Sequence, residues 1–261
     1  MELWLRADFA VLWQGQDPFA AAFALEGEIY RALEQRQTLA FTVDGKRYFI
    51  KRHRGVTYRE ILKNLLSLRM PVVSARNEYR AIRKLQQLGL RAPVIAAYGR
   101  RGTLPGKLES FLVTEDVGAH TTLEDHCRPW RSHQPAFAAK RALLDELADI
   151  SHTLHTNGVC HRDYYLCHFL RTAPDAPLTV IDLHRALVKP RLERRWIVKD
   201  LAGLYFSAMD CGVTRHDLFR FMRSYRRCSL RETLLRDREF WEAVRARAEH
   251  LYRREQNARR V

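Results

Sequence analysis

No segment of this sequence is apolar over a length that could cross a lipid bilayer. The most apolar early run, residues 19–25, is far shorter than the about 20 residues that a membrane-spanning helix needs. The N-terminal residues include Glu2, Arg6 and Asp8, charges that a secretory signal peptide lacks in its apolar core. We therefore expect a cytoplasmic protein whose contact with any membrane is peripheral.

Cysteine is scarce and shows no paired spacing. The chain has five cysteines and no Cys-x-x-Cys pair, which argues against a disulfide scaffold and favours free thiols in a reducing compartment. Cys160-His161 and Cys167-His168 raise the alternative of a zinc site, but their spacing fits no common structural zinc motif. We expect the cysteines to be small core residues.

Positive charge, in contrast, is abundant. The chain carries 45 Lys and Arg against 30 Asp and Glu, a formal net charge of +15. Such a charge attracts polyanions: nucleic acid, an acidic membrane surface, a phosphorylated glycolipid or an acidic protein. Residues 214–261 alone hold 14 Arg, no Lys and 7 acidic residues. Arginine suits bidentate recognition of phosphate, although a basic face that is merely solvated remains the alternative.

The aromatic residues of this arginine-rich segment disfavour nucleic acid as the partner. Their spacing is typical of packed helices rather than of a platform on which bases stack. They are Phe219, Phe221, Tyr225, Trp241 and Tyr252.

The first half of the chain mixes strands and helices. Strands are predicted at residues 38–43, 48–52, 93–98 and 110–114. Asp44-Gly45 between the first two is a typical hairpin turn. Residues 58–70 show an amphipathic helical pattern, and a second helix is predicted from an N-cap at Ser74 to Gly89.

The second half reads as mainly helical. Residues 136–157 form a long helical pattern, residues 178–183 read as a buried strand, and the chain is helical from residue 199 onward. We therefore predict an α+β protein with a mixed lobe at residues 1–116 and a mainly helical lobe at residues 117–261.

Two carboxylates of the second half stand at positions that suit chemistry. His161-Arg162-Asp163 follows the long helix, and Asp182 ends a predicted strand 19 residues later. Phosphoryl transfer needs a carboxylate that accepts the proton of the attacking hydroxyl, and ligands for the metal that holds the phosphates. A merely structural turn at residues 161–163 is the alternative.

The first half supplies the cation that such a reaction needs. Lys51 ends the second strand of the hairpin, and Glu78 lies in a following helix. A lysine can neutralise the phosphates of a nucleotide, and a carboxylate can hold that lysine in place. Taken one at a time, both residues would more often be solvated side chains.

The order of these residues resembles the protein-kinase superfamily. Longer segments narrow the likeness: HRDYYLCHF, VIDLHRA, KDLAGLYFSA, YFIKRHRG and KNLLSLRMPVVSARNEY are similar to the lipopolysaccharide core heptose kinases of Gram-negative bacteria. The similarity covers roughly residues 13–252. It implies a bilobal protein-kinase-like fold, ATP and Mg²⁺ as cofactors, and phosphorylation of the first heptose of the lipopolysaccharide inner core.

The resemblance also implies the roles of individual residues. Asp163 corresponds to the catalytic base, with Arg162 and His161 beside it, and Asp182 and His168 correspond to metal ligands. Nucleotide contacts are implied for Lys51, Glu78, Arg36, Glu115 and Val117.

Several positions depart from the protein-kinase pattern. His168 stands where protein kinases carry Asn, so it either ligates the metal in a less usual way or positions the loop. Asp182-Leu183-His184 lacks the usual glycine, and so does the predicted phosphate loop near residues 34–38, which leaves nucleotide binding to side chains. Asp200 either supports the backbone of the catalytic loop or caps the start of a helix.

The expected partners are the lipopolysaccharide inner core and an anionic membrane surface, and the charge also allows an acidic protein. The pattern at residues 58–70 places Ile61, Leu65 and Leu68 on one side. This side either docks on lipid or packs on the first lobe.

Other functions remain compatible with the same residues. A kinase of the neighbouring octulosonic acid or a protein tyrosine kinase would use the same machinery. A kinase-fold binding module for an acidic partner is the alternative of a different class, and the intact Lys51, Asp163 and Asp182 argue against it.

Overall fold

The structure, a computed structural model, describes residues 1–33, 36–55, 74–104 and 107–259. The chain divides into two compact units. Unit 1 comprises Met1–Arg83 and Pro93–Gly118, and unit 2 comprises Lys84–Ala92 and Ala119–Val261.

The strands described in unit 1 form one antiparallel sheet in the order β1-β5-β6-β4-β3-β2. They are β1 (Glu2–Leu5), β2 (Glu28–Leu33), β3 (Arg36–Val43), β4 (Lys46–Arg54), β5 (Ile95–Arg101) and β6 (Glu109–Glu115). The predicted hairpin joins β3 to β4. Its turn residues Asp44 and Gly45 both have positive φ, 48° and 75°, as a tight hairpin turn requires.

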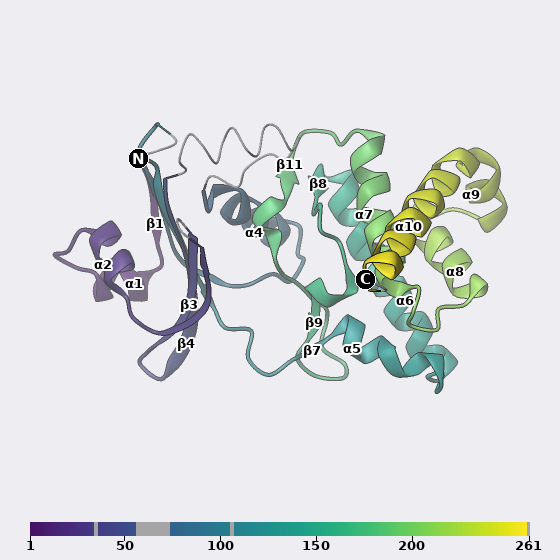
Figure 1. The fold of residues 1–261 in the computed structure, drawn as a ribbon, viewed down its shortest axis with the longest axis horizontal. Coiled ribbons are helices and arrows are strands. Elements are labelled where there is room, and N and C mark those ends of the chain that lie inside the picture. Colours follow the sequence, from purple (N-terminus) through teal and green to yellow (C-terminus); the bar gives the residue numbers. More distant parts are fainter. Residues whose placement is uncertain (34–35, 56–73, 105–106, 260–261) are drawn as a thin grey trace. The chain divides into compact units, whose positions relative to one another are not determined.

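Two short N-terminal helices, α1 (Ala7–Leu12) and α2 (Pro18–Ala24), cover one face of this sheet (Figure 1). Asp17 caps α2 by accepting hydrogen bonds from the backbone N–H groups of its first turn. Phe9, Trp13 and Phe19 are at most 5% exposed and pack against inward-facing residues of the strands. The sequence analysis predicted neither these helices nor β1 and β2.

The helix α4 (Arg76–Gln87) confirms the second predicted helix. The N-cap position is Ala75, one residue after the predicted Ser74, whose Oγ accepts the backbone N–H of Arg76 at 3.3 Å. Tyr79 stacks on Tyr98 of β5 with ring centroids 3.9 Å apart. The helix predicted at residues 58–70 lies outside the described residues.

Unit 2 is mainly helical. Its helices are α5 (Leu123–Cys127), α6 (Phe137–Thr156), α7 (Arg194–Ala208), α8 (Arg215–Arg226), α9 (Leu230–Arg236) and α10 (Arg238–Arg259), with short 3-10 helices η2 (Arg128–Arg131), η3 (Leu166–His168) and η4 (Leu183–Arg185). Short strands complete the unit: β7 (Thr121–Thr122), β8 (Val159–Cys160), β9 (Phe169–Arg171), β10 (Thr179–Val180) and β11 (Leu187–Val188).

Helices α6, α7, α8 and α10 share one hydrophobic core. Tyr225 is 4% exposed at its centre, and Phe221 and Trp241 pack against it. These aromatic side chains are therefore core residues, as predicted. The long helix predicted at residues 136–157 is confirmed as α6.

The strand predicted at residues 178–183 is wrong over its second half. Only Thr179 and Val180 pair with β9. Asp182 then adopts a left-handed backbone with φ 59°, and η4 follows at once. A positive φ turns the chain out of the extended conformation, so the strand cannot continue to residue 183. The helix predicted from residue 199 also begins earlier, at Arg194.

All five cysteines lie within the described residues and are free thiols, as predicted. Cys127, Cys160 and Cys211 are buried core residues. Burial raises the pKa of the Cys167 thiol to about 11, so this thiol stays protonated at neutral pH. None of the helices that the structure describes combines the length and the apolarity needed to cross a membrane.

Candidate active site

The loop of residues 161–168 in unit 2 is anchored by a buried aspartate. Asp200, within α7, is 1% exposed and accepts the backbone N–H groups of His161 at 2.6 Å and Arg162 at 2.8 Å. The N-cap of α7 is Glu193. Of the two roles that the sequence left open for Asp200, the structure therefore selects support of the loop. These hydrogen bonds offset the cost of the positive φ at Arg162, 74°.

His161 is fully buried and joins this loop to the chain just before Asp182. Its Nε2 donates to the carbonyl oxygen of Ile181 at 2.8 Å, and its ring stacks on His168 with centroids 5.5 Å apart. Burial lowers the pKa of His161, so the ring is neutral near pH 7. The structure thus gives His161 a positioning contact.

Asp163 and His168 occupy opposite ends of the same short turn. The Nδ1 of His168 donates to the backbone carbonyl oxygen of Asp163 at 2.6 Å. A carbonyl only accepts, so in the neutral ring the proton is on Nδ1 and the lone pair is on Nε2. That Nε2 lies 3.5 Å from Oδ2 of Asp182. His168 therefore both positions the loop and presents a possible ligand atom next to Asp182.

Asp182 is the carboxylate that the sequence assigns to the metal. Its side chain is 34% exposed, and its Oδ1 accepts a hydrogen bond from Nδ1 of His184 at 2.5 Å. Mg²⁺ is commonly held by one or two carboxylates together with substrate phosphates and water, so an accessible Asp182 fits such an ion. Across the described ranges, no three His, Cys, Asp or Glu side chains form a metal site by themselves.

In unit 1, Lys51 and Glu78 form an ion pair. The Nζ of Lys51, on β4, lies 2.6 Å from Oε1 of Glu78, in the first turn of α4. Glu78 is 5% exposed, whereas the lysine side chain is 29% exposed. A buried carboxylate that holds a more accessible ammonium group can present that cation to a phosphate.

The other three predicted nucleotide contacts also lie in unit 1. Arg36 begins β3 opposite His53 of β4, and the rest of the predicted phosphate loop is described only in part. Glu115 ends β6, and its carboxylate accepts hydrogen bonds from Lys46 and from Arg6. Its side chain therefore links β6 to β4 and to Arg6, just before α1, and its backbone N–H donates to the carbonyl oxygen of Val94 at 2.8 Å. Val117 follows β6 in an irregular segment and is half-buried.

Sequence reasoning missed three basic groups around the carboxylates of unit 2. Arg185 donates to Asp163 at 2.7 Å, and His184 donates to Asp182. Lys199 is half-buried, next to Asp200 in the sequence. The segment VIDLHRA, which carried the family likeness, contains the first two, but the sequence alone does not show which carboxylate each one meets.

These contacts define what the chain can do chemically. Unit 2 holds one carboxylate in a rigid loop and a second, accessible carboxylate beside two imidazoles. Unit 1 holds an ammonium group on a buried carboxylate. These are the groups that phosphoryl transfer to a hydroxyl requires: a base, a metal ligand and a cation for the phosphates.

Comparisons with known proteins agree with this chemistry. The model of the lipopolysaccharide kinase (Kdo/WaaP) family matches residues 20–225. The chain is 45% identical to the lipopolysaccharide core heptose(I) kinase WaaP of Pseudomonas aeruginosa over 98% of each chain. It is 43% identical to the protein of the same name from Escherichia coli over 94% of each chain.

A solved structure has the same fold. It is described as WaaP in complex with acyl carrier protein, is 41% identical, and superposes with a TM-score of 0.84 over 97% of this chain and 100% of that chain. The α+β, protein-kinase-like fold class predicted from the sequence is thereby confirmed.

Proposed function

The chain belongs to the lipopolysaccharide kinase (Kdo/WaaP) family, and we propose that it phosphorylates the first heptose of the lipopolysaccharide inner core with ATP. The observation that carries this proposal is the fixed position of Asp163. Its loop is held by Asp200 and His168, as a base must be held before the acceptor arrives. The identity of the acceptor is inferred from the relatives, which are named heptose(I) kinases.

In the proposed reaction the heptose hydroxyl attacks the γ-phosphorus of ATP. The new O–P bond forms as the bond to the bridging oxygen breaks, and ADP leaves. Asp163 accepts the hydroxyl proton. Lys51, held by Glu78, neutralises phosphate charge. Asp182 would hold Mg²⁺, which supplies further charge neutralisation at the phosphates.

The direct test is mass spectrometry of dephosphorylated core oligosaccharide after incubation with ATP and Mg²⁺. We expect a gain of one phosphate on the first heptose. Parallel incubations with the neighbouring octulosonic acid and with a tyrosine peptide test the two alternative acceptors. Phosphate on either of these, with none on heptose, would assign the chain to that acceptor.

We also propose an acyl carrier protein as the acidic protein partner. Unit 2 contains a cavity of about 760 Å³ between α6, α7, α8 and α10, lined mainly by apolar side chains such as Leu147, Leu204 and Met222. An acyl chain would bury its methylenes there at about 0.8 kcal/mol each. The solved relative is described in complex with such a protein.

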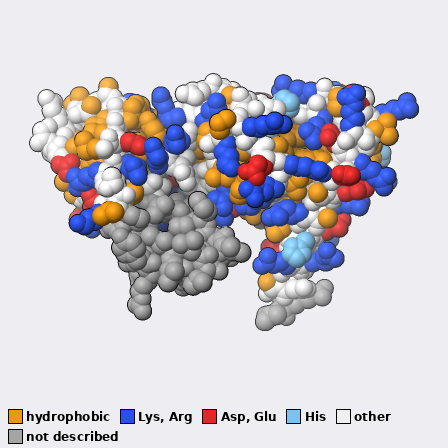
Figure 2. Space-filling view, turned by 90° about the horizontal axis from the view of Figure 1, so that it is seen from above, with side chains coloured by type: hydrophobic (Ala, Val, Ile, Leu, Met, Phe, Trp, Pro, Cys, Tyr) orange, Lys and Arg blue, Asp and Glu red, His pale blue; other side chains and the backbone are white. Residues whose placement is uncertain are grey.

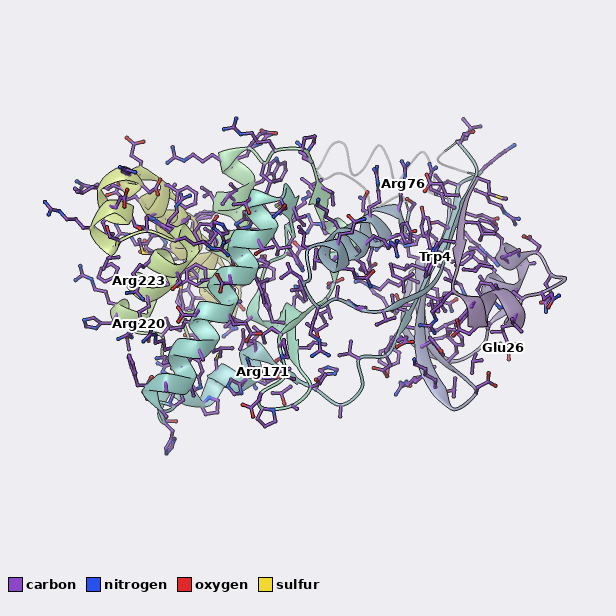
Figure 3. All side chains as sticks on the ribbon, turned by 180° about the vertical axis from the view of Figure 1, so that it is seen from behind. Trp4, Glu26, Arg76, Arg171, Arg220 and Arg223 are labelled. Carbon is purple, nitrogen blue, oxygen red and sulfur yellow. The ribbon has the colours of Figure 1, made fainter. Side chains whose placement is uncertain are left out.

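The surface near this cavity is basic. Arg215 and Arg238 belong to its lining, and Arg220 and Arg223 extend from α8, one of the helices that form it (Figure 3). Figure 2 shows blue Lys and Arg side chains over one face of unit 2, interleaved with hydrophobic side chains and with some red Asp and Glu side chains. Such a surface complements an acidic protein.

Binding of acyl carrier protein with and without its acyl chain tests this proposal by calorimetry. We expect the acylated form to bind more tightly, by about fourfold for each buried methylene, and Arg238→Glu to weaken both forms. Arg195→Glu, an exposed arginine outside the cavity lining, is the matched control. Equal affinity for the two forms would exclude the cavity as an acyl site.

Finally, we propose that the enzyme docks reversibly on the anionic inner face of the inner membrane, because its acceptor is a glycolipid and its net charge is +15. The segment 58–70, named as a docking element from the sequence, lies outside the described residues. The proposal therefore rests on charge.

A further inference from the structure

The carboxylate of Asp163 is held by Arg185, which lies three residues after Asp182 in the sequence. The Nη1 of Arg185 donates to Oδ1 of Asp163 at 2.7 Å and lies 3.1 Å from Oδ2. Because Nη1 is close to both oxygens, the guanidinium lies at the end of the carboxylate, between Oδ1 and Oδ2. Each oxygen has a second lone pair, which can accept a hydrogen bond from an acceptor hydroxyl.

The backbone conformation around Asp182 fixes the position of the Arg185 Cα, from which this side chain extends. Asp182 takes a left-handed conformation, and η4 spans the three residues Leu183–Arg185 directly after it. The backbone N–H of Ala186 closes this turn on the carbonyl oxygen of Leu183 at 2.9 Å. The side chain of Arg185 therefore starts one tight turn after Asp182, the candidate metal ligand. The same short segment thus carries Asp182 and the arginine that contacts Asp163.

Two further cations lie near this pair. Arg162 and Lys199 lie near the same carboxylates, and burial together with the charge of Arg185 lowers the pKa of both. Of these three cations, Arg185 donates directly to the carboxylate of Asp163. The side chain of Asp163 is 16% exposed and that of Arg185 is 33% exposed, and a partly buried, charge-assisted hydrogen bond is stronger than an exposed one.

We propose that Arg185 is a positioning residue for phosphoryl transfer: it fixes the orientation of the Asp163 carboxylate towards the acceptor hydroxyl. This inference rests on the proposed function. Without Arg185 the carboxylate can rotate about its side-chain bonds and can turn to Arg162 or Lys199. The loop backbone would stay in place, because Asp200 and His168 hold it independently.

The experiment is a double-mutant cycle on the full chain, with ATP, Mg²⁺ and dephosphorylated core oligosaccharide. Arg185→Ala is expected to lower kcat by about 10²-fold, the cost of a misplaced catalytic group, with the affinity for ATP unchanged. In an Asp163→Asn background the same change is expected to cost less than about threefold, because the group that it orients is already disabled. A purely structural role would cost the same in both backgrounds.

The matched control is Arg226→Ala. Arg226 also pairs with an aspartate, Asp237, at 2.9 Å, and its side chain is 29% exposed, but it lies outside the loop. We expect it to keep wild-type kcat. Circular dichroism checks folding. If Arg185→Ala does not fold, the double-mutant cycle is repeated with Arg185→Met, which keeps the apolar stem of the side chain.

The outcomes separate this inference from the proposed function. If the wild type does not phosphorylate heptose, the proposed function fails. If the wild type is active and Asp163→Asn retains only a small residual kcat, but Arg185→Ala keeps wild-type kcat, the inference fails alone. Equal losses from Arg185→Ala in both backgrounds would also overturn it.

Discussion

The imidazole of His168 donates from Nδ1 to the backbone carbonyl oxygen of Asp163 at 2.6 Å, which ties the end of the loop to the backbone of Asp163. Asparagine can donate a similar hydrogen bond from its amide. We therefore expect His168→Asn to keep part of the kinase activity and His168→Leu to lose much more, measured as kcat on core oligosaccharide. A His168→Asn enzyme without any activity would mean that the imidazole ligates the metal or has another role.

Substitution of Asp182 should affect metal-dependent nucleotide binding, unlike substitution of the loop residue His168. Asp182→Asn keeps the shape of the side chain but removes the charge that a hard cation prefers. We expect weaker Mg²⁺-dependent ATP binding, measured by calorimetry with and without Mg²⁺, together with a lower kcat and a greater loss than in His168→Asn. If ATP binding by Asp182→Asn depended on Mg²⁺ as it does in the wild type, Asp182 would not be the metal ligand.

Asp163→Ala should separate catalysis from nucleotide binding. Removal of a general base typically costs about 10²- to 10⁴-fold in rate, whereas the base does not hold the nucleotide. We expect that loss in kcat with ATP affinity and the circular dichroism spectrum preserved. Wild-type turnover by a folded variant would refute the proposed mechanism.

Substitutions of Lys51 and of Glu78 should have coupled effects on activity. Lys51→Met removes the cation, and Glu78→Gln removes the carboxylate that holds it at 2.6 Å. Each change alone is expected to lower kcat/KM for ATP, and the double variant should lose less than the combined single losses. Arg47→Met, which breaks the ion pair between Glu28 and a more exposed cation on the same strand as Lys51, is the control. Fully additive losses would argue against a functional pair.

Asp200 should make stability depend on pH. Burial opposes its ionisation, yet the nearby His155 and His161 hold the pKa of the carboxyl below its usual range. A lowered pKa in the folded state means that the unfolded state binds more protons in acid. The stabilisation is therefore complete above the unfolded pKa of about 3.9 and is lost as pH falls toward the lower, folded value.

The matching variant is Asp200→Asn. An amide accepts through one oxygen only, so one loop N–H loses its partner at a cost of about 1–3 kcal/mol in the free energy of unfolding. Thermal denaturation should show a lower Tm at pH 7 and a smaller difference between variant and wild type in acid. A difference in Tm that does not change with pH would contradict the lowered pKa.

Anionic vesicles test the membrane proposal. Each basic residue near such a surface contributes about 1 kcal/mol, and the attraction falls off within a Debye length. We expect sedimentation with anionic vesicles at low salt, much weaker binding at physiological salt, and little binding to neutral vesicles. Equal binding to both kinds of vesicle at all salt concentrations would refute the electrostatic account.

Sequence by itself determined the local elements and the order of the reactive residues. The β3–β4 hairpin follows from Asp44-Gly45, because few other residue pairs accept positive φ at both turn positions. The start of α4 follows, to within one residue, from Ser74, and α6 from its helical periodicity. The resemblance of HRDYYLCHF and VIDLHRA was enough to name Asp163 and Asp182.

Only the tertiary structure decided what those residues contact. Asp200 meets the backbone of Arg162, 38 residues away, and Arg185 meets Asp163, 22 residues away. The strand β1 is recognisable only beside its partner β5. Local propensity acts over a few residues, whereas these contacts depend on where the packed helices and strands bring distant segments together. That is why the sequence could single out Asp163 but not the arginine that contacts it.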